Sequence, residues 1–375
     1  MCPSEPSARS LLSSPIVVRA ESITHLIPDA VPYRQPWLHP AQCFSALAHF
    51  HGPSRGTMSN NAPNTPLIGL SRCLTGEGVR FDGGSKRHRF VMDELGKHVH
   101  FTTVCPEADA GLGVPRPALR LLNRDGSVRM VESRSGRDQT DPVERAIDAA
   151  LDELEAQPLC GFVVTRRSPS CGLERVPIYR ENGHRGSSGE GLLVKALKER
   201  MPLVPIEEDG RLEDEGLRDR FLTRVFTLHR WRETVGDRPT MARLQAFHAS
   251  HKSLFTAHDE AATRALGRGI ATCKAEHLSA YAEQYIRHVM TLLTRPAGRG
   301  AHINVLQHVL GHFRNTLGQP TRNALQFMLG EYAQGHVRLA PVRGLFHHHA
   351  QTAGSEWLQN QAYFSPYPIA LRGAG

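Results

Sequence analysis

Residues 66–73 read PLIGLSRC, an unbroken apolar run that ends in a serine, an arginine and a cysteine. A short apolar run bounded by turn-forming residues is typical of a strand that is buried on both faces of a sheet. Residues 98–104 (HVHFTTV) and 161–165 (GFVVT) share this β-branched and aromatic character. Helical patterns separate the runs, as in 143–156, where apolar residues recur on one face. This alternation predicts an α/β domain built on a parallel, layered sheet.

A cysteine follows each of the three predicted strands, at most six residues after the strand ends. Cys73, Cys105 and Cys171 stand in the turn-forming contexts SRCLTG, VCPE and SPSCG. Because the loops after parallel strands gather at one edge of the sheet, where ligands bind, we expect the three thiols to converge. Thiolates bind zinc or iron–sulfur clusters, and a set of three leaves one coordination position open for chemistry. The alternative is that they are small buried residues at strand ends.

The remaining cysteines carry no such signal. None of the seven cysteines belongs to a CxxC pair, which argues against a zinc ribbon and against a thioredoxin-like redox motif. Cys160 precedes a predicted strand and Cys273 lies in a helical region, so both are interpreted as structural residues. Cys2 and Cys43 lie in an N-terminal stretch without periodicity and are poor candidates for function.

Polar residues accompany the three thiols along the chain. Glu107 lies two residues after the second cysteine, where a cluster and apolar walls would shift its pKa and suit it to proton transfer. Ser168 lies three residues before the third cysteine, close enough to face the same cavity. Asp82 and Arg116 belong to glycine-rich turns and are candidates for positioning a polar ring. Each of these residues, taken alone, is also explained as a turn residue or a surface charge.

Composition divides the chain into five segments. Residues 1–64 are rich in Ser, Pro, Ala and His without periodicity, which indicates a disordered extension, and Met58 offers an alternative translation start. We then expect an α/β domain at 65–210, a charged linker at 211–237, an all-helical domain at 238–350 and an irregular tail at 351–375.

The excess positive charge is confined to the C-terminal third. The formal net charge is +8, and residues 238–375 hold 14 Lys and Arg against 6 Asp and Glu, together with 12 of the 21 His. Residues 1–237 therefore hold equal numbers of basic (Lys and Arg) and acidic (Asp and Glu) side chains. A basic module beside a neutral one favours a polyanionic partner, with nucleic acid the usual candidate, and a merely basic surface is the alternative.

Nothing in the sequence indicates a membrane span or an export signal. Hydrophobic residues make up 40% of the chain, and no apolar run approaches the length of about 18 residues that a membrane helix needs. The N-terminus also lacks the charged-then-apolar layout of a secretory signal. We therefore expect a soluble, cytoplasmic protein without membrane contact.

Three segments together resemble the signature segments of the thiouracil desulfidase family. They read SRCLTGEGVRFDGG, VCPEADAGLGVPRP and RRSPSCG, and they occur in this order within 66–201. The resemblance implies a three-layer α/β/α fold and a 4Fe–4S cluster held by the three cysteines, with one iron left for the sulfur of the substrate. It also implies catalytic roles for Glu107 and Ser168. The sequence LGVP at 112–115 departs from the LPTP that the family often has there.

Residues 247–259 (FHASHKSLFTAHD), followed by RALGR, resemble a helical domain that is fused behind this module in transfer-RNA 4-thiouridine desulfidases. This resemblance implies non-redox conversion of 4-thiouridine in tRNA to uridine, with release of sulfide. His248, Lys252 and Arg264 are candidate RNA contacts, because cations that neutralise phosphates give salt-dependent binding. Ordinary helix surface, or a core position for His248, is the alternative.

Three other functions fit the same residues. The first is a desulfidase of free 2- or 4-thiouracil, with the helical domain in another role. The second is an RNA-binding sensor whose iron–sulfur cluster performs no turnover. The third is a zinc hydrolase that uses the same three thiolates. Glu107 and Ser168 separate an enzyme from a sensor, because only an enzyme needs them for turnover.

Overall fold

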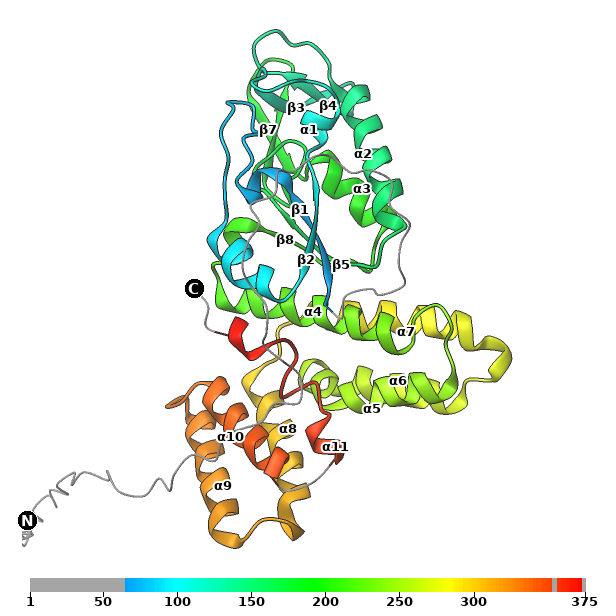
Figure 1. The fold of residues 1–375 in the computed structure, drawn as a ribbon, viewed down its shortest axis with the longest axis vertical. Helices are drawn as coiled ribbons and strands as arrows, with labels where there is room; N and C mark the ends of the chain where they lie inside the picture. Colours follow the sequence, from blue (N-terminus) through cyan, green and yellow to red (C-terminus); the bar gives the residue numbers. More distant parts are fainter. Residues whose placement is uncertain (1–64, 353–355, 373–375) are drawn as a thin grey trace, which may run out of the picture. The chain divides into compact units, whose positions relative to one another are not determined.

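The computed structural model describes residues 65–352 and 356–372, and Figure 1 shows how their elements are arranged. The chain divides into a unit Met1–Asn60 and a unit Asn61–Gly375, and all the described residues belong to the second. The expected N-terminal extension, with Met58 and two of the seven cysteines, lies outside the described residues.

Four parallel strands form the central sheet, in the order β2, β1, β5, β8. They span Leu67–Ser71 (β1), His100–Val104 (β2), Leu159–Val164 (β5) and Ile206–Glu208 (β8). The first three are the strands that the apolar runs predict. Every residue of β5 is buried, as expected for a parallel strand that is covered on both faces.

Helices cover both faces of this sheet (Figure 1). On one face α2 (Thr140–Glu155) and α3 (Leu192–Arg200) share a hydrophobic core with Leu159, Phe162 and Val164 of β5. On the other face, η2 (Phe90–Glu94), η3 (Leu95–Lys97) and α4 (Glu215–Thr234) share a second core with Cys160 and Val163 of that strand. The predicted three-layer α/β/α architecture with a parallel sheet is therefore confirmed.

Helix α4 approaches the sheet closely at Gly161 in β5. A Cβ atom at this position would lie 2.7 Å from Val225 Cγ2 and 3.3 Å from the Phe221 ring. A contact of 2.7 Å is too short for two carbon atoms, so a larger residue would push the helix off the strand.

The segment that we expected to be a charged linker, residues 211–237, is mostly helix α4, so that expectation was wrong. Asp214 caps the helix by accepting a hydrogen bond from the backbone N–H of Leu217 at 2.8 Å. Nine residues of the helix are buried, which makes it a core element. The charges at its start concealed this role, because its buried apolar residues begin only at Phe221.

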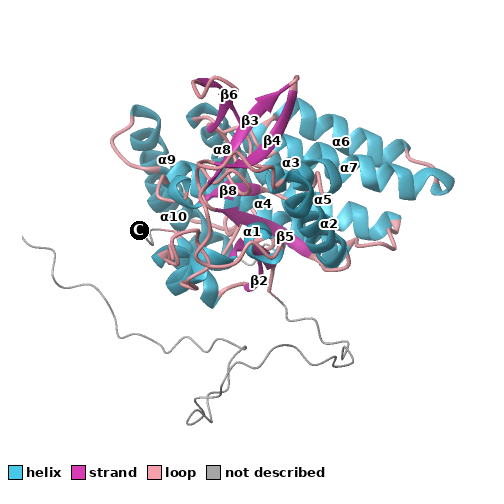
Figure 2. Cartoon of the chain, turned by 90° about the horizontal axis from the view of Figure 1, so that it is seen from above, coloured by secondary structure: helices cyan, strands magenta, loops and turns pink. Residues whose placement is uncertain are grey.

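A second, mixed sheet was not expected from the sequence. Its strands lie in the order β4, β3, β6, β7 and span Leu119–Arg124 (β3), Ser127–Glu132 (β4), Val176–Arg180 (β6) and Arg185–Gly189 (β7). Strands β3 and β4 form an antiparallel hairpin whose Asp-Gly turn is typical of such connections. Figure 2 shows this hairpin as a group of strands separate from β2 and β5.

The C-terminal part is helical, as predicted. Its helices are α5 (Met241–His258), α6 (Glu260–Thr272), α7 (Leu278–Leu292), α8 (Arg299–His312), α9 (Gln319–Gln334), α10 (Leu339–Thr352) and α11 (Glu356–Gln359). The stretch expected as a tail begins inside α10 and includes α11. Arg230 of α4 fixes the chain after α11 by donating hydrogen bonds of 2.8 Å to the carbonyls of Ser365 and Pro366.

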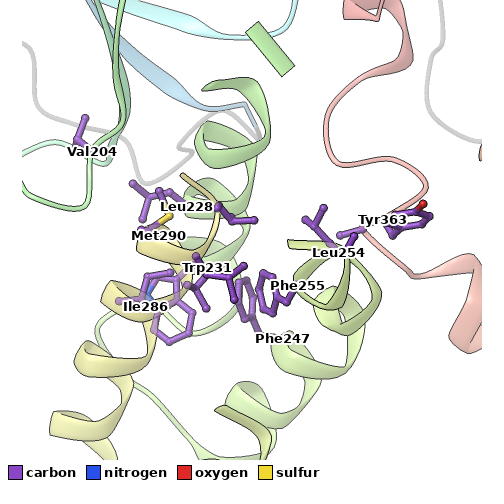
Figure 3. Close-up of a cluster of buried hydrophobic side chains, with 14 of the residues drawn as sticks. Val204, Leu228, Trp231, Phe247, Leu254, Phe255, Ile286, Met290 and Tyr363 are labelled. Carbon is purple, nitrogen blue, oxygen red and sulfur yellow. The ribbon is translucent and has the colours of Figure 1, made fainter. Parts of the chain in front are cut away.

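Trp231, near the end of α4, lies in the core of the helical part (Figure 3). Its ring centroid lies 5.1 Å from that of Phe247 on α5 at a nearly perpendicular angle of 85°, and 5.6 Å from that of Tyr285 on α7 in a stacked arrangement. Helix α4 therefore packs on the sheet through its middle and on the helices through its end.

Replacing Trp231 by alanine should destabilise the protein by about 3–5 kcal/mol, because it removes a buried aromatic side chain and leaves a cavity. Urea denaturation monitored by circular dichroism measures this free energy of unfolding. The matched control is Phe327→Ala, in which the lost ring is 67% exposed and the expected change is within about 0.5 kcal/mol. Equal stabilities of the two variants would contradict the packing of α4 on the helices.

Candidate active site

The three predicted cysteines line one cavity of about 430 Å³. Cys73 lies in η1 (Arg72–Thr75), directly after β1, and Cys105 lies between β2 and α1 (Pro106–Asp109). Cys171 lies in the loop that follows β5. Because β2, β1 and β5 are neighbours in one parallel sheet, their carboxyl ends bring the three loops together.

Burial raises the pKa of each of the three thiols. For Cys171 the pKa reaches about 12, with smaller contributions from Glu107 and from the thiol of Cys105. The Cys73 sulfur lies 2.9 Å from the Thr165 hydroxyl. Without a metal the thiols are therefore protonated at neutral pH, and a bound metal would displace their protons.

The donor set fits an iron–sulfur cluster. Among the described residues, no three His, Cys, Asp or Glu side chains are arranged around a single metal ion. In a cluster each thiolate binds its own iron, so the ligands surround a group of atoms. Three thiols on three loops that line one cavity match that requirement.

Glu107 is held by a buried ion pair in the same cavity. Arg116 donates from Nε and Nη2 to Glu107 Oε2, at 3.0 and 2.8 Å, and both residues are more than 90% buried. The guanidinium also donates from Nη1 to the carbonyls of Val79 and Gly113 at 2.9 and 3.1 Å. Since a buried charge is costly unless it is paired and hydrogen-bonded, the two groups stabilise each other, and Arg116 fixes the position of the carboxylate.

Ser170 connects Glu107 to Ser168, and the sequence analysis missed it. The Ser170 hydroxyl donates to Glu107 Oε1 at 2.8 Å and lies 3.0 Å from the Ser168 hydroxyl. Ser168 Oγ also accepts from the backbone N–H of Cys171 at 3.1 Å. Ser170 is 1% exposed, and burial is the signal that marks it. In the sequence it is only the residue before a cysteine.

The loop that carries these serines is fixed by the start of α3. The backbone N–H of Leu193 donates to the Ser170 carbonyl at 2.9 Å, and that of Gly191 donates to the Gly172 carbonyl at 2.8 Å. A Cβ atom at Gly191 would lie 2.4 Å from the Ser170 carbonyl oxygen, which leaves room only for glycine. The site thus depends on backbone contacts from Gly191 and Leu193, which lie 27 and 29 residues beyond the end of β5.

Of the two residues proposed to position a substrate ring, Arg116 and Asp82, only Arg116 lies at the cavity. Arg116 lines the cavity and pairs with Glu107, so it acts as a support for the carboxylate. Asp82 does not line the cavity. Its carboxylate accepts from the backbone N–H of Gly84 at 3.0 Å and lies 3.5 Å from Arg80, so it shapes the turn.

Positive charge surrounds the cavity. Besides Arg116, it is lined by Arg72, Arg80, Arg166 and Arg167. Arg72 is paired with Asp109 at 2.9 Å, whereas Arg166 and Arg167 make no ion pair with any described residue. Phe81, also on the wall, is 41% exposed. The combination of free guanidinium groups and an accessible aromatic ring suits an anionic ligand that carries a planar base.

The three candidate RNA contacts line a different cavity, between helices of the C-terminal part. Lys252 and Arg264 are exposed there. His248 donates or accepts a hydrogen bond with the Tyr285 hydroxyl at 2.9 Å, and burial lowers its pKa to about 4. His248 is therefore neutral at pH 7 and supplies no positive charge for a phosphate.

Two family models match separate parts of the chain. Residues 68–209 match the model of 2-thiouracil desulfurase, and this range contains the three cysteines, Glu107 and Ser168. Residues 252–368 match the model of a protein family of unknown function, DUF1722. The chain is thus composed of a thiouracil desulfidase-like domain and a helical DUF1722 region.

Two individual proteins are similar to it over nearly their whole length. The uncharacterized protein YbgA of Escherichia coli (strain K12) is 34% identical over 161 residues, which are 42% of this chain and 95% of YbgA. The solved structure of the [4Fe-4S]-dependent thiouracil desulfidase TudS is 34% identical, with 40% of this chain and 94% of that chain covered and a TM-score of 0.33. Residues 68–209 thus form a thiouracil desulfidase-like domain. No helix among the described residues is long and apolar enough to span a membrane.

Buried histidines in the helical part predict a loss of stability in acid. Burial lowers the pKa of His251 to about 3 and that of His302 to about 4, so the folded state keeps these rings neutral. The unfolded chain takes up protons below its own pKa of about 6.5. The free energy of unfolding should therefore fall as the pH drops from about 6.5 towards 4.

Thermal unfolding of the metal-free protein across this pH range measures the effect. His251→Phe retains a ring against Phe247, whose centroid is 4.1 Å away, and should flatten the decline. Replacing the exposed His277 by Gln should leave the profile unchanged. A wild-type midpoint that does not move between pH 6.5 and 4 would rule out this linkage.

Proposed function

We propose that the chain converts 4-thiouridine in transfer RNA to uridine, using a 4Fe–4S cluster held by Cys73, Cys105 and Cys171. The observation that carries the proposal is the placement of three thiols, Glu107 and Ser168 on the wall of one cavity. The match of residues 68–209 to the model of 2-thiouracil desulfurase supports the reaction, and the similar protein TudS is described as [4Fe-4S]-dependent.

The reaction is a hydrolysis in which no electrons are transferred. Water adds to the ring carbon of the thiocarbonyl group, the carbon–sulfur bond breaks, and the products are the oxo-pyrimidine and sulfide. A cluster with three protein thiolates leaves one iron open, which supplies a Lewis acid for the sulfur of the substrate. The protein must then bind the ring, hold a water molecule and move protons.

Glu107 and its partners are suited to the proton transfers. Arg116 occupies Glu107 Oε2, while Oε1 accepts only from Ser170 among the described residues and retains a lone pair for water or a ring N–H. The Ser170 hydroxyl lies 2.8 Å from this oxygen, and the Ser168 hydroxyl lies 3.0 Å from the Ser170 hydroxyl. We assign Glu107 as the general base and acid, and Ser168 as the group that holds or relays the proton.

The charge of the protein supports RNA as the substrate. Residues 238–375 carry the whole positive excess, and Arg166 and Arg167 add unpaired cations at the cavity. A free thiobase has no phosphate for these groups to bind, whereas each nucleotide of tRNA provides one.

Glu107→Gln and Ser168→Ala should each reduce desulfidation at least a hundredfold, the range expected when a general acid–base group is lost. The visible absorbance of the cluster should remain, because neither side chain is a proposed ligand. Multiple-turnover release of sulfide from thiolated tRNA measures the rate. If both variants kept the full rate, the assigned roles would be wrong, and a sensor without turnover would show no rate in the wild type either.

The substrate assignment is tested with the full-length holoprotein purified without oxygen. Thiolated tRNA and free 4-thiouracil are compared by the loss of thiocarbonyl absorbance, and we expect a higher kcat/KM for the tRNA, falling steeply with added salt. Iron and acid-labile sulfide should be present, and replacing any of the three cysteines by serine should remove both. Activity on the free base alone would contradict the tRNA assignment, and a colourless, active, zinc-loaded protein would contradict the cluster.

A further inference from the structure

A second cavity, of about 610 Å³, opens between α5, α6, α8 and α11 in the helical part. We call it the helical recess and define it by His248, Lys252, Arg264, His308, His312 and Trp357. Its volume falls within the range of about 300–1,000 Å³ typical of small-molecule sites. None of its residues lines the cavity of the three cysteines.

An accessible aromatic pair forms one wall of the helical recess. The rings of His312 and Trp357 have centroids 4.7 Å apart, and Trp357 is 37% exposed. Val305 and Val309 of α8 are almost completely buried and contribute an apolar surface beside this pair. An indole that remains accessible beside an apolar surface is suited to stacking against another planar ring.

Basic side chains also line the helical recess. Lys252 makes no ion pair with any described residue, and Arg264 is 61% exposed. One carboxylate, that of Glu260, also lines the helical recess. It accepts from Arg264 at 2.6 Å and from the Asn304 amide at 3.2 Å, so the charges of Glu260 and Arg264 balance each other and the charge of Lys252 is left in excess. The net field in the helical recess is therefore positive and attracts an anion.

We propose that the helical recess binds one unpaired nucleotide of an RNA, with its base on Trp357 and its phosphate on Lys252 and Arg264. The proposal rests on the proposed function, which makes RNA the substrate, and it adds a second RNA contact away from the chemistry. An unpaired base is required because a base inside a duplex offers no free face for stacking. Stacking on an aromatic side chain tolerates any base, so this contact would add affinity without selecting a sequence.

The test measures binding of the full-length holoprotein to a labelled single-stranded oligoribonucleotide and to a blunt RNA duplex of equal length. Trp357→Ala should weaken single-strand binding by at least about fivefold and leave duplex binding nearly unchanged. Lys252→Glu should weaken both and lower the slope of log K against log salt by about 0.7 or more for the single strand. The control, Lys274→Glu, makes the same change at an exposed lysine outside the helical recess and should have an effect below about twofold.

Lys252→Gln serves as a second, milder variant, and thermal unfolding shows that each protein is folded. Wild-type affinity of both Trp357→Ala and Lys252→Gln for the single strand overturns the proposal. Displacement of the RNA by polyglutamate as effectively as by unlabelled RNA also overturns it, because the site would then bind anions in general.

Desulfidation of free 4-thiouracil by the same variants separates this proposal from the proposed function. We expect wild-type rates on the free base, since the helical recess lies apart from the three cysteines. If wild-type protein binds RNA through the helical recess but releases no sulfide from thiolated tRNA, the proposed function fails while the binding site stands. If it desulfidates tRNA and all variants bind RNA like the wild type, the binding site fails while the proposed function stands.

Discussion

The parallel pairing of β2, β1 and β5 is the constraint on which the candidate site depends. These hydrogen-bonded strands run in one direction, so the three loops that carry Cys73, Cys105 and Cys171 emerge at one edge of the sheet. The pairing is possible because both faces of the sheet are covered, one by α2 and α3 and the other by α4. A change that loosens these strands would therefore move all three thiols at once.

A buried polar network organises the cavity once the loops have met. Arg116 and Glu107 are too deeply buried to remain charged alone, and each oxygen of the carboxylate is bound by a different partner. The same network reaches Ser168 through Ser170, so the carboxylate, the hydroxyl groups and the neighbouring thiol are held as one unit. Rigid polar groups of this kind lower the cost of reorganisation during a reaction.

Helix α4 packs against both the central sheet and the helices of the C-terminal part. Phe221 and Val225 pack at Gly161, and Trp231 packs between aromatic rings of α5 and α7. The helical part is consequently joined to the desulfidase-like domain by shared core and not by a flexible connection. The helical part carries the excess of basic side chains and the helical recess, and it packs on the same helix, α4, as the sheet does.

The sequence by itself determined the three main strands, their parallel, layered arrangement with helices, the helical C-terminal part and the convergence of three cysteines on one cavity, because local periodicity and the strand–cysteine spacing are properties of short segments. It missed α4, where charges at the start of the helix hide an apolar face. It also missed the sheet of β3, β4, β6 and β7, whose two local pairs are joined by the pairing of the distant segments β3 and β6. Only the tertiary structure showed that Ser170 links Glu107 to Ser168, that Asp82 shapes a turn, and that His248 is neutral. The roles of Ser170 and His248 depend on burial and on partners far along the chain, Glu107 and Tyr285, which no local pattern encodes. The place of Asp82 outside the cavity depends on how the loops fold around it.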